Sequence, residues 1–266
     1  MKFKNLLVLF LLWSCCAHAQ IATNLASRIV YRLDYQPDSI DAKHIETEFF
    51  LLDFSKEQSV FRSESTHIKD SILISANPTN LLQVAKTQFK YTIVKNSATN
   101  DLRSYHDYTT FNFVIDEEPV DFVWQLLDDT KEIIGYSCRA ASTTFKGRKY
   151  IAFFTDKIPA SDGPYKFKSL PGVILEIYDD QQHYHFLAVS ALNLGHTYDY
   201  QFSKIADYRN ITERELREFE EKVKEKPSFI LQNPGIQLPA EAYEKYDRSQ
   251  RERNKNRNNP IERITY

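Results

Sequence analysis

The chain has 266 residues, a formal net charge of −2, only 6 glycines and 3 cysteines, but 18 phenylalanines and 16 tyrosines. So few glycines and cysteines exclude a collagen-like chain and a disulfide scaffold, and so many aromatic residues exclude a disordered chain. The near-neutral charge gives no reason to expect a nucleic acid as partner. The length suits one globular domain, with or without a short appendage.

The N-terminal residues are typical of a secretory signal peptide. Lys2 and Lys4 precede an uninterrupted apolar run over residues 6–13, and an Ala-x-Ala site follows directly before Gln20. The apolar run is too short to cross a bilayer as a helix. We therefore predict that residues 1–19 are cleaved before Gln20 and that the protein is exported, to the periplasm or the outer surface.

The cysteines leave a second possibility for the N-terminal segment. Cys15 and Cys16 follow the apolar run, so lipid attachment to one of them, as in a lipoprotein, is the alternative to cleavage before Gln20. Cleavage before Gln20 leaves Cys138 as the single cysteine of the mature chain. The mature protein would then fold without an internal disulfide.

Residues 20–207 are predicted to form an antiparallel β domain. Short runs rich in β-branched and aromatic residues alternate with polar breaks, and no long helix separates them. Successive strands without crossover helices should be antiparallel, and a sheet of 10–11 strands must curl, close or split. We expect a mainly β (α+β) fold with a strongly curled sheet or an open barrel. The expected strands cover residues 28–35, 47–54, 58–65, 88–95, 108–115, 122–127, 131–145, 148–156, 172–178 and 183–194.

The C-terminal part differs from this domain in its pattern. Residues 208–246 are predicted to form a helix followed by an irregular segment, and Thr212 and Glu215 form a capping box at the start of that helix. Residues 247–266 are polar and basic, which predicts a disordered tail. Peripheral contact of this tail with anionic lipid head groups is a further hypothesis.

Most of the glycines lie in one window of the sequence, between residues 135 and 172. Gly147 lies between two expected strands, as a hairpin turn requires. The pair Pro171 and Gly172 predicts a type II turn with the glycine at positive φ. Ser169, two residues before this pair, predicts that its own position does not demand a conformation that only glycine adopts.

A set of residues in and around this window carries a family resemblance. It comprises Trp124, Gly135-Tyr136, Cys138, Gly147-Arg148, Gly163-Pro164 and Leu170-Pro171-Gly172-Val173-Ile174. Together with the apolar segments at 50–52 and 59–61 and the Asn-Pro-Ile-Glu segment at 259–262, it resembles the GLPGLI family of exported Gram-negative proteins. Ser169 stands where that family has its first Gly, and Val173 where it has Leu. The resemblance implies export and carries over no catalytic residue or ligand.

Candidate site residues follow from the motif and from residue chemistry. The candidate binding residues are Trp124, Tyr136, Cys138, Arg148, Pro164, Pro171 and Gly172. His183 and His185 are two residues apart on an expected strand, so both can lie on one face and form half of a metal site. Cys138 has two interpretations, a buried core residue or a nucleophile. Exposed or solvated positions are the competing interpretation for both histidines.

No catalytic signature is present in the sequence. We found no phosphate loop, no G-x-S-x-G elbow, no H-E-x-x-H and no CxxC. This favours a non-enzymatic binding or accessory protein of the cell envelope, with an apolar ligand, a lipid or an envelope protein as partner and no cofactor. Aromatic residues on the inner face of a curled sheet could line a cavity or fill a core. The alternatives are a thiol- or metal-dependent hydrolase of the envelope and a structural subunit of an envelope assembly.

Overall fold

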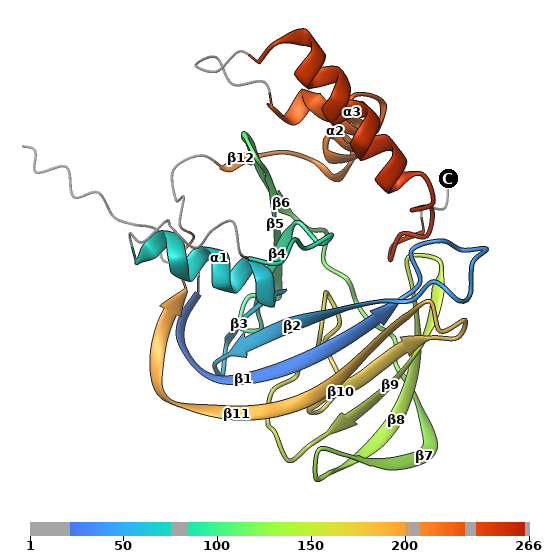
Figure 1. Cartoon of the computed structure of the whole chain (residues 1–266). Coiled ribbons are helices and arrows are strands. Elements are labelled where there is room, and N and C mark those ends of the chain that lie inside the picture. The colour runs from blue at the N-terminus through green and yellow to red at the C-terminus, as the bar shows by residue number, and fades with distance from the viewer. Residues whose placement is uncertain (1–21, 76–83, 201, 203–207, 232–237, 264–266) are drawn as a thin grey trace, which may run out of the picture.

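The computed structural model describes residues 22–75, 84–200, 202, 208–231 and 238–263, and the predicted signal peptide lies outside them. Twelve strands in these ranges form one sheet, in the order β12-β6-β5-β4-β3-β2-β1-β11-β10-β9-β8-β7. Neighbouring strands are antiparallel, except that β12 is parallel to β6. The sheet curls without closing, which confirms the expected fold class (Figure 1).

The strands and helices have the following bounds. The strands are β1 (Ala22–Tyr35), β2 (Glu46–Phe54), β3 (Gln58–Ser63), β4 (Tyr91–Asn96), β5 (Asp101–Tyr108), β6 (Phe111–Asp116), β7 (Gln125–Ile133), β8 (Tyr136–Phe145), β9 (Arg148–Thr155), β10 (Val173–Asp179), β11 (Tyr184–Tyr200) and β12 (Tyr208–Asn210). The helices are α1 (Glu64–Ile74), α2 (Glu213–Glu225), the 3₁₀ helix η2 (Pro227–Leu231) and α3 (Ala240–Asn254).

Two tight hairpins connect β7, β8 and β9, the three strands at one edge of the sheet. The φ angles are 45° at Ile134 and 83° at Gly135, between β7 and β8, and 44° at Lys146 and 77° at Gly147, between β8 and β9. Positive φ at two successive turn residues is the pattern of type I′ turns, whose twist matches that of the flanking strands. The second hairpin confirms the predicted turn at Gly147. The first corrects the expected single strand over 131–145, because Gly135 permits a turn inside it.

The C-terminal segment is more ordered than the sequence suggested. Helix α3 runs to Asn254, so the disordered tail predicted for residues 247–266 is wrong over 247–263, the part that the structure describes. Residues 240–254 contain strong helix formers and neither glycine nor proline. The carboxylate of Asp247 also accepts hydrogen bonds from the amide and hydroxyl of Ser228, at 2.5 and 3.1 Å, which docks α3 on η2. Helix α2 confirms the capping box at its first turn.

A loop of the chain itself fills the inner face of the curl. We call residues 160–172 the inner loop. Its Phe167 is fully buried, with its ring centroid 4.7 Å from that of Tyr150 on β9, and its Tyr165 lies 5.4 Å from Tyr91 on β4. Five strands separate β4 from β9 in the sheet, so the loop spans the inner face. Aromatic packing therefore occupies the space in which the sequence allowed a cavity.

A buried lysine on β4 also holds the inner loop in place. The ammonium group of Lys95, on β4, donates to the carbonyls of Gly163 and Tyr165 at 2.6 and 3.1 Å and pairs with Asp162. Burial lowers the pKa of Lys95, and the carboxylate of Asp162 opposes this shift. The ion pair and the carbonyls together satisfy a charge that would otherwise be costly to bury.

The turn at the end of the inner loop departs from two sequence expectations. Ser169 has a φ of 76°, so its position does take up the left-handed conformation that glycine favours. The amide of Gly172 donates to the carbonyl of Leu170 at 2.8 Å, which closes a three-residue turn instead of the predicted type II turn. Glycine is needed at position 172 because a Cβ there would lie 2.0 Å from the carbonyl oxygen of Thr155.

Replacement of Ser169 by glycine should stabilise the protein. A left-handed conformation costs an L-residue about 1–2 kcal/mol, and Ser169 is exposed, so little packing is lost. The greater freedom of glycine in the unfolded chain offsets part of this gain. We expect the free energy of unfolding of Ser169→Gly to rise by about 0.5–1 kcal/mol in urea titrations. A decrease would contradict the strain assigned to this position.

Candidate functional site

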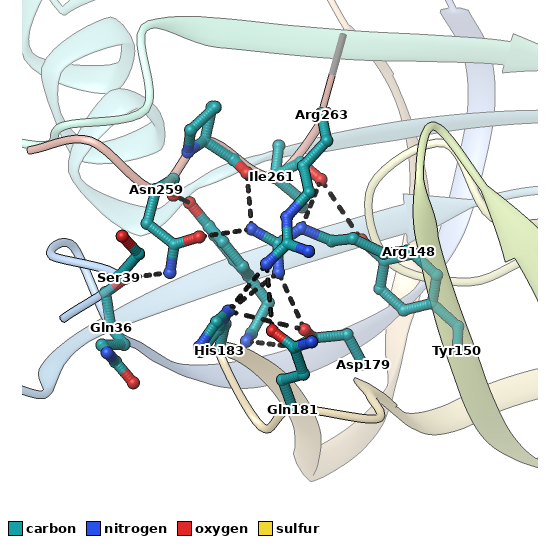
Figure 2. A network of polar contacts seen from close by, with 12 residues as sticks. Gln36, Ser39, Arg148, Tyr150, Asp179, Gln181, His183, Asn259, Ile261 and Arg263 are labelled. Carbon is teal, nitrogen blue, oxygen red and sulfur yellow. Dashed lines mark hydrogen bonds and ion pairs between the residues drawn. The ribbon is translucent and has the colours of Figure 1, made fainter. Parts of the chain in front are cut away.

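Arg148, a residue of the family-like motif, lies at the centre of a buried polar cluster (Figure 2). Its guanidinium pairs with the carboxylate of Asp179 at 2.8 Å, and both side chains are 1% exposed. It also donates to the side chain of Asn259 at 2.6 Å and to the carbonyls of Pro260 and Ile261 at 2.8 and 3.1 Å. Arg148 therefore attaches the C-terminal segment to the sheet rather than facing solvent.

We call residues 259–263 the C-terminal strap. Arg148 is not its only anchor. The side chain of Asn259 donates to the carbonyl of Gln36 at 2.8 Å, and the backbone carbonyl of Asn259 accepts from the Tyr184 hydroxyl at 2.6 Å. A Cβ on Gly147 would lie 3.0 Å from the Cβ of Arg263, so the glycine at the hairpin leaves room for the strap. The strap joins the ends of β1, β9 and β11 (Figure 2).

The two candidate metal ligands lie in separate clusters. His183 Nδ1 is 3.2 Å from a guanidinium nitrogen of Arg148 and 3.2 Å from one of Arg263. His185 Nε2 is 2.8 Å from a carboxylate oxygen of Glu176. Within the described ranges, no group of three or more His, Cys, Asp or Glu side chains is arranged to hold a metal ion. A metal site at these histidines stays a prediction.

The other motif residues lie against the inner loop or inside the core. The indole N–H of Trp124 donates to the carbonyl of Lys168 at 2.9 Å. Pro164 is buried in the inner loop, whereas Pro171 is exposed at its end. Cys138 is fully buried, its thiol donates to the carbonyl of Tyr136 at 3.4 Å, and burial raises its pKa to about 11. A thiol in this state is a poor nucleophile.

A groove outside this core has a distinct character. Two adjoining cavities of about 590 and 570 Å³ lie between α3 and strands β4 and β5, and they share Lys90, Tyr91 and Tyr246 among their lining residues. We call them together the basic groove. Its basic lining residues are Lys69, Lys86, Lys90, Lys224, Arg251, Arg253, Lys255 and Arg257, and its acidic ones are Asp107 and Glu220. Its aromatic lining residues are Phe89, Tyr91, Tyr108 and Tyr246.

One wall of the groove carries a chain of polar contacts that the sequence did not indicate. His106 lines the groove, and its Nε2 is 3.1 Å from the hydroxyl oxygen of Ser104, which donates to Glu117 at 2.5 Å. Glu117 also accepts from the ammonium of Lys166 in the inner loop at 2.8 Å. The sequence does not predict a strand over residues 101–107, because the polar residues of β5 hide its two-residue periodicity.

The buried imidazole of His106 makes the stability of the protein depend on pH. Burial, with a smaller effect of Lys166, lowers the pKa of His106 to about 4. Between pH 6.5 and 4, the unfolded chain therefore binds a proton at this residue that the folded chain does not, so the free energy of unfolding falls as the pH falls through this range. We expect His106→Gln to flatten the slope by up to about 1.4 kcal/mol per pH unit. The measurement is urea unfolding at pH 7, 6 and 5, with a Gln variant of the exposed His196 as control. An unchanged slope in His106→Gln would contradict this assignment.

Comparison with known proteins adds a family match and a likeness of fold. A family model described as a protein of unknown function (Porph_ging) matches residues 142–176, which span β9 and the inner loop. No curated protein matches the chain significantly. No helix in the described ranges is both long and apolar enough to cross a membrane.

Two solved structures, both of PNGF-II, share the fold. The crystal form in space group P21 gives a TM-score of 0.52 at 10% identity, over 75% of this chain and 34% of that chain. The C2 form gives 0.50 at 11% identity, over 76% and 33%. The present chain thus spans about a third of the length of these proteins. The match to a family of unknown function and the likeness of fold leave the activity to be inferred from the site.

Proposed function

We propose that this protein is an exported, non-enzymatic binding protein of the cell envelope, a member of the GLPGLI family, which holds a ligand in the basic groove. The ligand class that fits is a small anionic molecule with an apolar or aromatic part. The observation that carries the proposal is the charge of the groove: of the described residues, eight basic and two acidic ones line it, although the whole chain has a formal net charge of −2. Carboxylates outside the lining pair with three of these cations, Lys224, Arg251 and Arg257, which leaves an excess of positive charge from the other five.

The size and lining of the groove support this ligand class. Each of the two cavities is in the range of sites for small molecules, about 300–1,000 Å³. Tyr91 and Tyr246 line both cavities and offer ring surface to an apolar group. The cationic side chains attract a negative charge before contact and orient it within the groove.

The inner face of the sheet is a weaker candidate for a ligand site. Phe167 and Tyr165 of the inner loop occupy the space that a carrier with this curl would need for an apolar molecule. The basic groove is therefore preferred over the apolar cavity that the aromatic composition suggested. A lipid with an anionic head group is one molecule of the proposed ligand class.

The chemistry of the described site favours binding over catalysis. Cys138 has no hydrogen bond to a histidine within the described ranges, and burial keeps it a thiol. Ser104 lies between His106 and Glu117, whereas a nucleophilic triad places the histidine between the serine and the carboxylate. Ser104 is also only 1% exposed, which keeps its hydroxyl away from a ligand in the groove.

Calorimetric titration with two matched naphthalene compounds tests the proposed site. We expect 1-naphthalenesulfonate, an anion, to bind more tightly than the neutral 1-naphthalenemethanol, and the affinity of the anion to fall as salt is added. The double variant Lys90→Gln and Arg251→Gln should weaken binding of the anion roughly tenfold. The control, Lys149→Gln with Lys157→Gln, removes two exposed cations outside the groove. Equal losses in the two double variants would contradict the site.

Export is tested separately, on the protein recovered from cell envelopes. We expect the mass and the N-terminal sequence of the mature chain to begin at Gln20. A lipid-modified chain beginning at Cys15 or Cys16 would support the lipoprotein alternative, and an intact Met1 would contradict export. Capture of envelope proteins with the mature chain as bait tests the structural-subunit alternative.

A further inference from the structure

The polar contacts behind the basic groove determine how His106 meets a ligand. Ser104 and His106 are two residues apart on β5 and interact directly, at 3.1 Å, so they lie on one side of the strand. Ser104 is 1% exposed, while His106 lines the groove. The serine hydroxyl is therefore behind the imidazole, on the side away from a bound molecule.

The position of one proton follows from the partners of Ser104. A hydroxyl has a single proton, and that of Ser104 is donated to the carboxylate of Glu117 at 2.5 Å. The other oxygen of the Glu117 carboxylate accepts from the ammonium of Lys166 at 2.8 Å. The Ser104 oxygen then faces His106 only with lone pairs, so the Nε2 of His106 must be the donor in that contact.

A neutral imidazole that carries its proton on Nε2 has a lone pair on Nδ1. Within the described ranges, Nδ1 of His106 has no hydrogen-bond partner among the side chains and backbone groups around it. We infer that Nδ1 of His106 is a specificity-determining hydrogen-bond acceptor of the basic groove, and that the ligand is an anion that also carries a hydroxyl or N–H donor. This inference rests on the proposed function.

Ser104 acts in this scheme as a positioning residue. It fixes which nitrogen of His106 carries the proton, and Glu117 and Lys166 fix Ser104. Loss of the Ser104 hydroxyl would leave the imidazole free to exchange its proton between the two nitrogens. Part of the acceptor character at Nδ1 would then be lost without any change in the charge of the groove.

Two anions that differ by one hydroxyl test the acceptor. We expect the wild-type protein to bind 4-hydroxyphenylacetate about 3–10-fold more tightly than phenylacetate, which is the gain in affinity typical of one added hydrogen bond. In His106→Phe, which keeps a ring but removes the acceptor, the two anions should bind equally. In Ser104→Ala the preference should shrink. The ¹⁵N NMR spectrum of the unliganded wild type should show the Nε2–H form of His106, and that of Ser104→Ala a mixture of both forms.

The outcomes separate this inference from the proposed function. If both anions bind with equal affinity to the wild type, or if His106→Phe keeps the preference, the acceptor role of His106 is wrong while the groove remains a binding site. If the NMR spectrum shows the Nδ1–H form, the assignment of Nε2 as the donor to Ser104 is wrong. If neither anion binds to the folded wild type at millimolar concentration, the proposed function fails as well.

Discussion

Replacement of Arg148 by methionine is expected to lower the free energy of unfolding by about 3–5 kcal/mol, because it leaves the buried carboxylate of Asp179 without its partner. The substitution also removes the guanidinium donors to Asn259, Pro260 and Ile261, so the C-terminal strap should detach. Urea unfolding measures the first effect. Faster hydrogen exchange over residues 259–263 reports the second.

The neighbouring Lys149 offers a matched control for this prediction. It occupies the next position on β9 but is exposed, so Lys149→Met should change the free energy of unfolding by no more than about 0.5 kcal/mol. Similar losses in the two variants would show that the effect of Arg148→Met comes from the strand and not from the buried cluster. The protein with Arg148→Met should retain its sheet, since the strap contributes to the main hydrophobic core only through the partly buried Ile261.

A single added methyl group at Gly172 should be as damaging as the loss of Arg148. A Cβ at this position would lie 2.0 Å from the carbonyl oxygen of Thr155, and backbone atoms on both sides must move to accommodate it. We expect Gly172→Ala to lower the free energy of unfolding by about 3–5 kcal/mol, from overpacking together with strain at positive φ.

A substitution at Gly135 distinguishes overpacking from strain at positive φ. Its φ is 83°, and nothing lies within 4 Å of the place where a Cβ would be. We therefore expect Gly135→Ala to lower the free energy of unfolding by about 1–2 kcal/mol, the cost of the left-handed conformation alone. Equal losses in Gly135→Ala and Gly172→Ala would contradict the close contact with Thr155. The same unfolding titrations serve both variants.

Local signals in the sequence were sufficient for part of the fold. The capping box at Thr212 predicted the start of α2, and Gly147 predicted the hairpin between β8 and β9. Both depend on contacts between residues a few positions apart, which the sequence displays directly. The curled, open sheet also followed from the number of strands and the lack of crossover helices.

Long-range contacts account for what the sequence did not show. The inner loop is fixed by Lys95, which is about seventy residues away in the chain, and a lysine in a strand pattern gives no sign that it will be buried against carbonyl groups. The C-terminal strap is ordered by Arg148, more than one hundred residues earlier. Without knowledge of these contacts, a polar, basic ending was most simply interpreted as disordered.

The candidate site shows the same limit. Arg148 and Gly172 were singled out by their pattern, and each lies at a point where the fold needs that residue type. Pro164, from the same motif, is buried in the inner loop. The residues that line the basic groove come from α1, β4, β5, α2, η2 and α3 and from the segment before β4, so no single segment of sequence marks the groove. His106 could have been found only by recognising β5, whose alternation is obscured by polar residues on both faces.

Arg148 and the C-terminal strap form one structural unit, joined by the buried hydrogen bond between Arg148 and Asn259. A double-mutant cycle between these two residues tests this claim. Urea unfolding gives the free energies of the wild type, Arg148→Met, Asn259→Ala and the double variant. We predict a coupling energy of about 1–3 kcal/mol between the two side chains. Additive losses, with a coupling energy near zero, would contradict the claim.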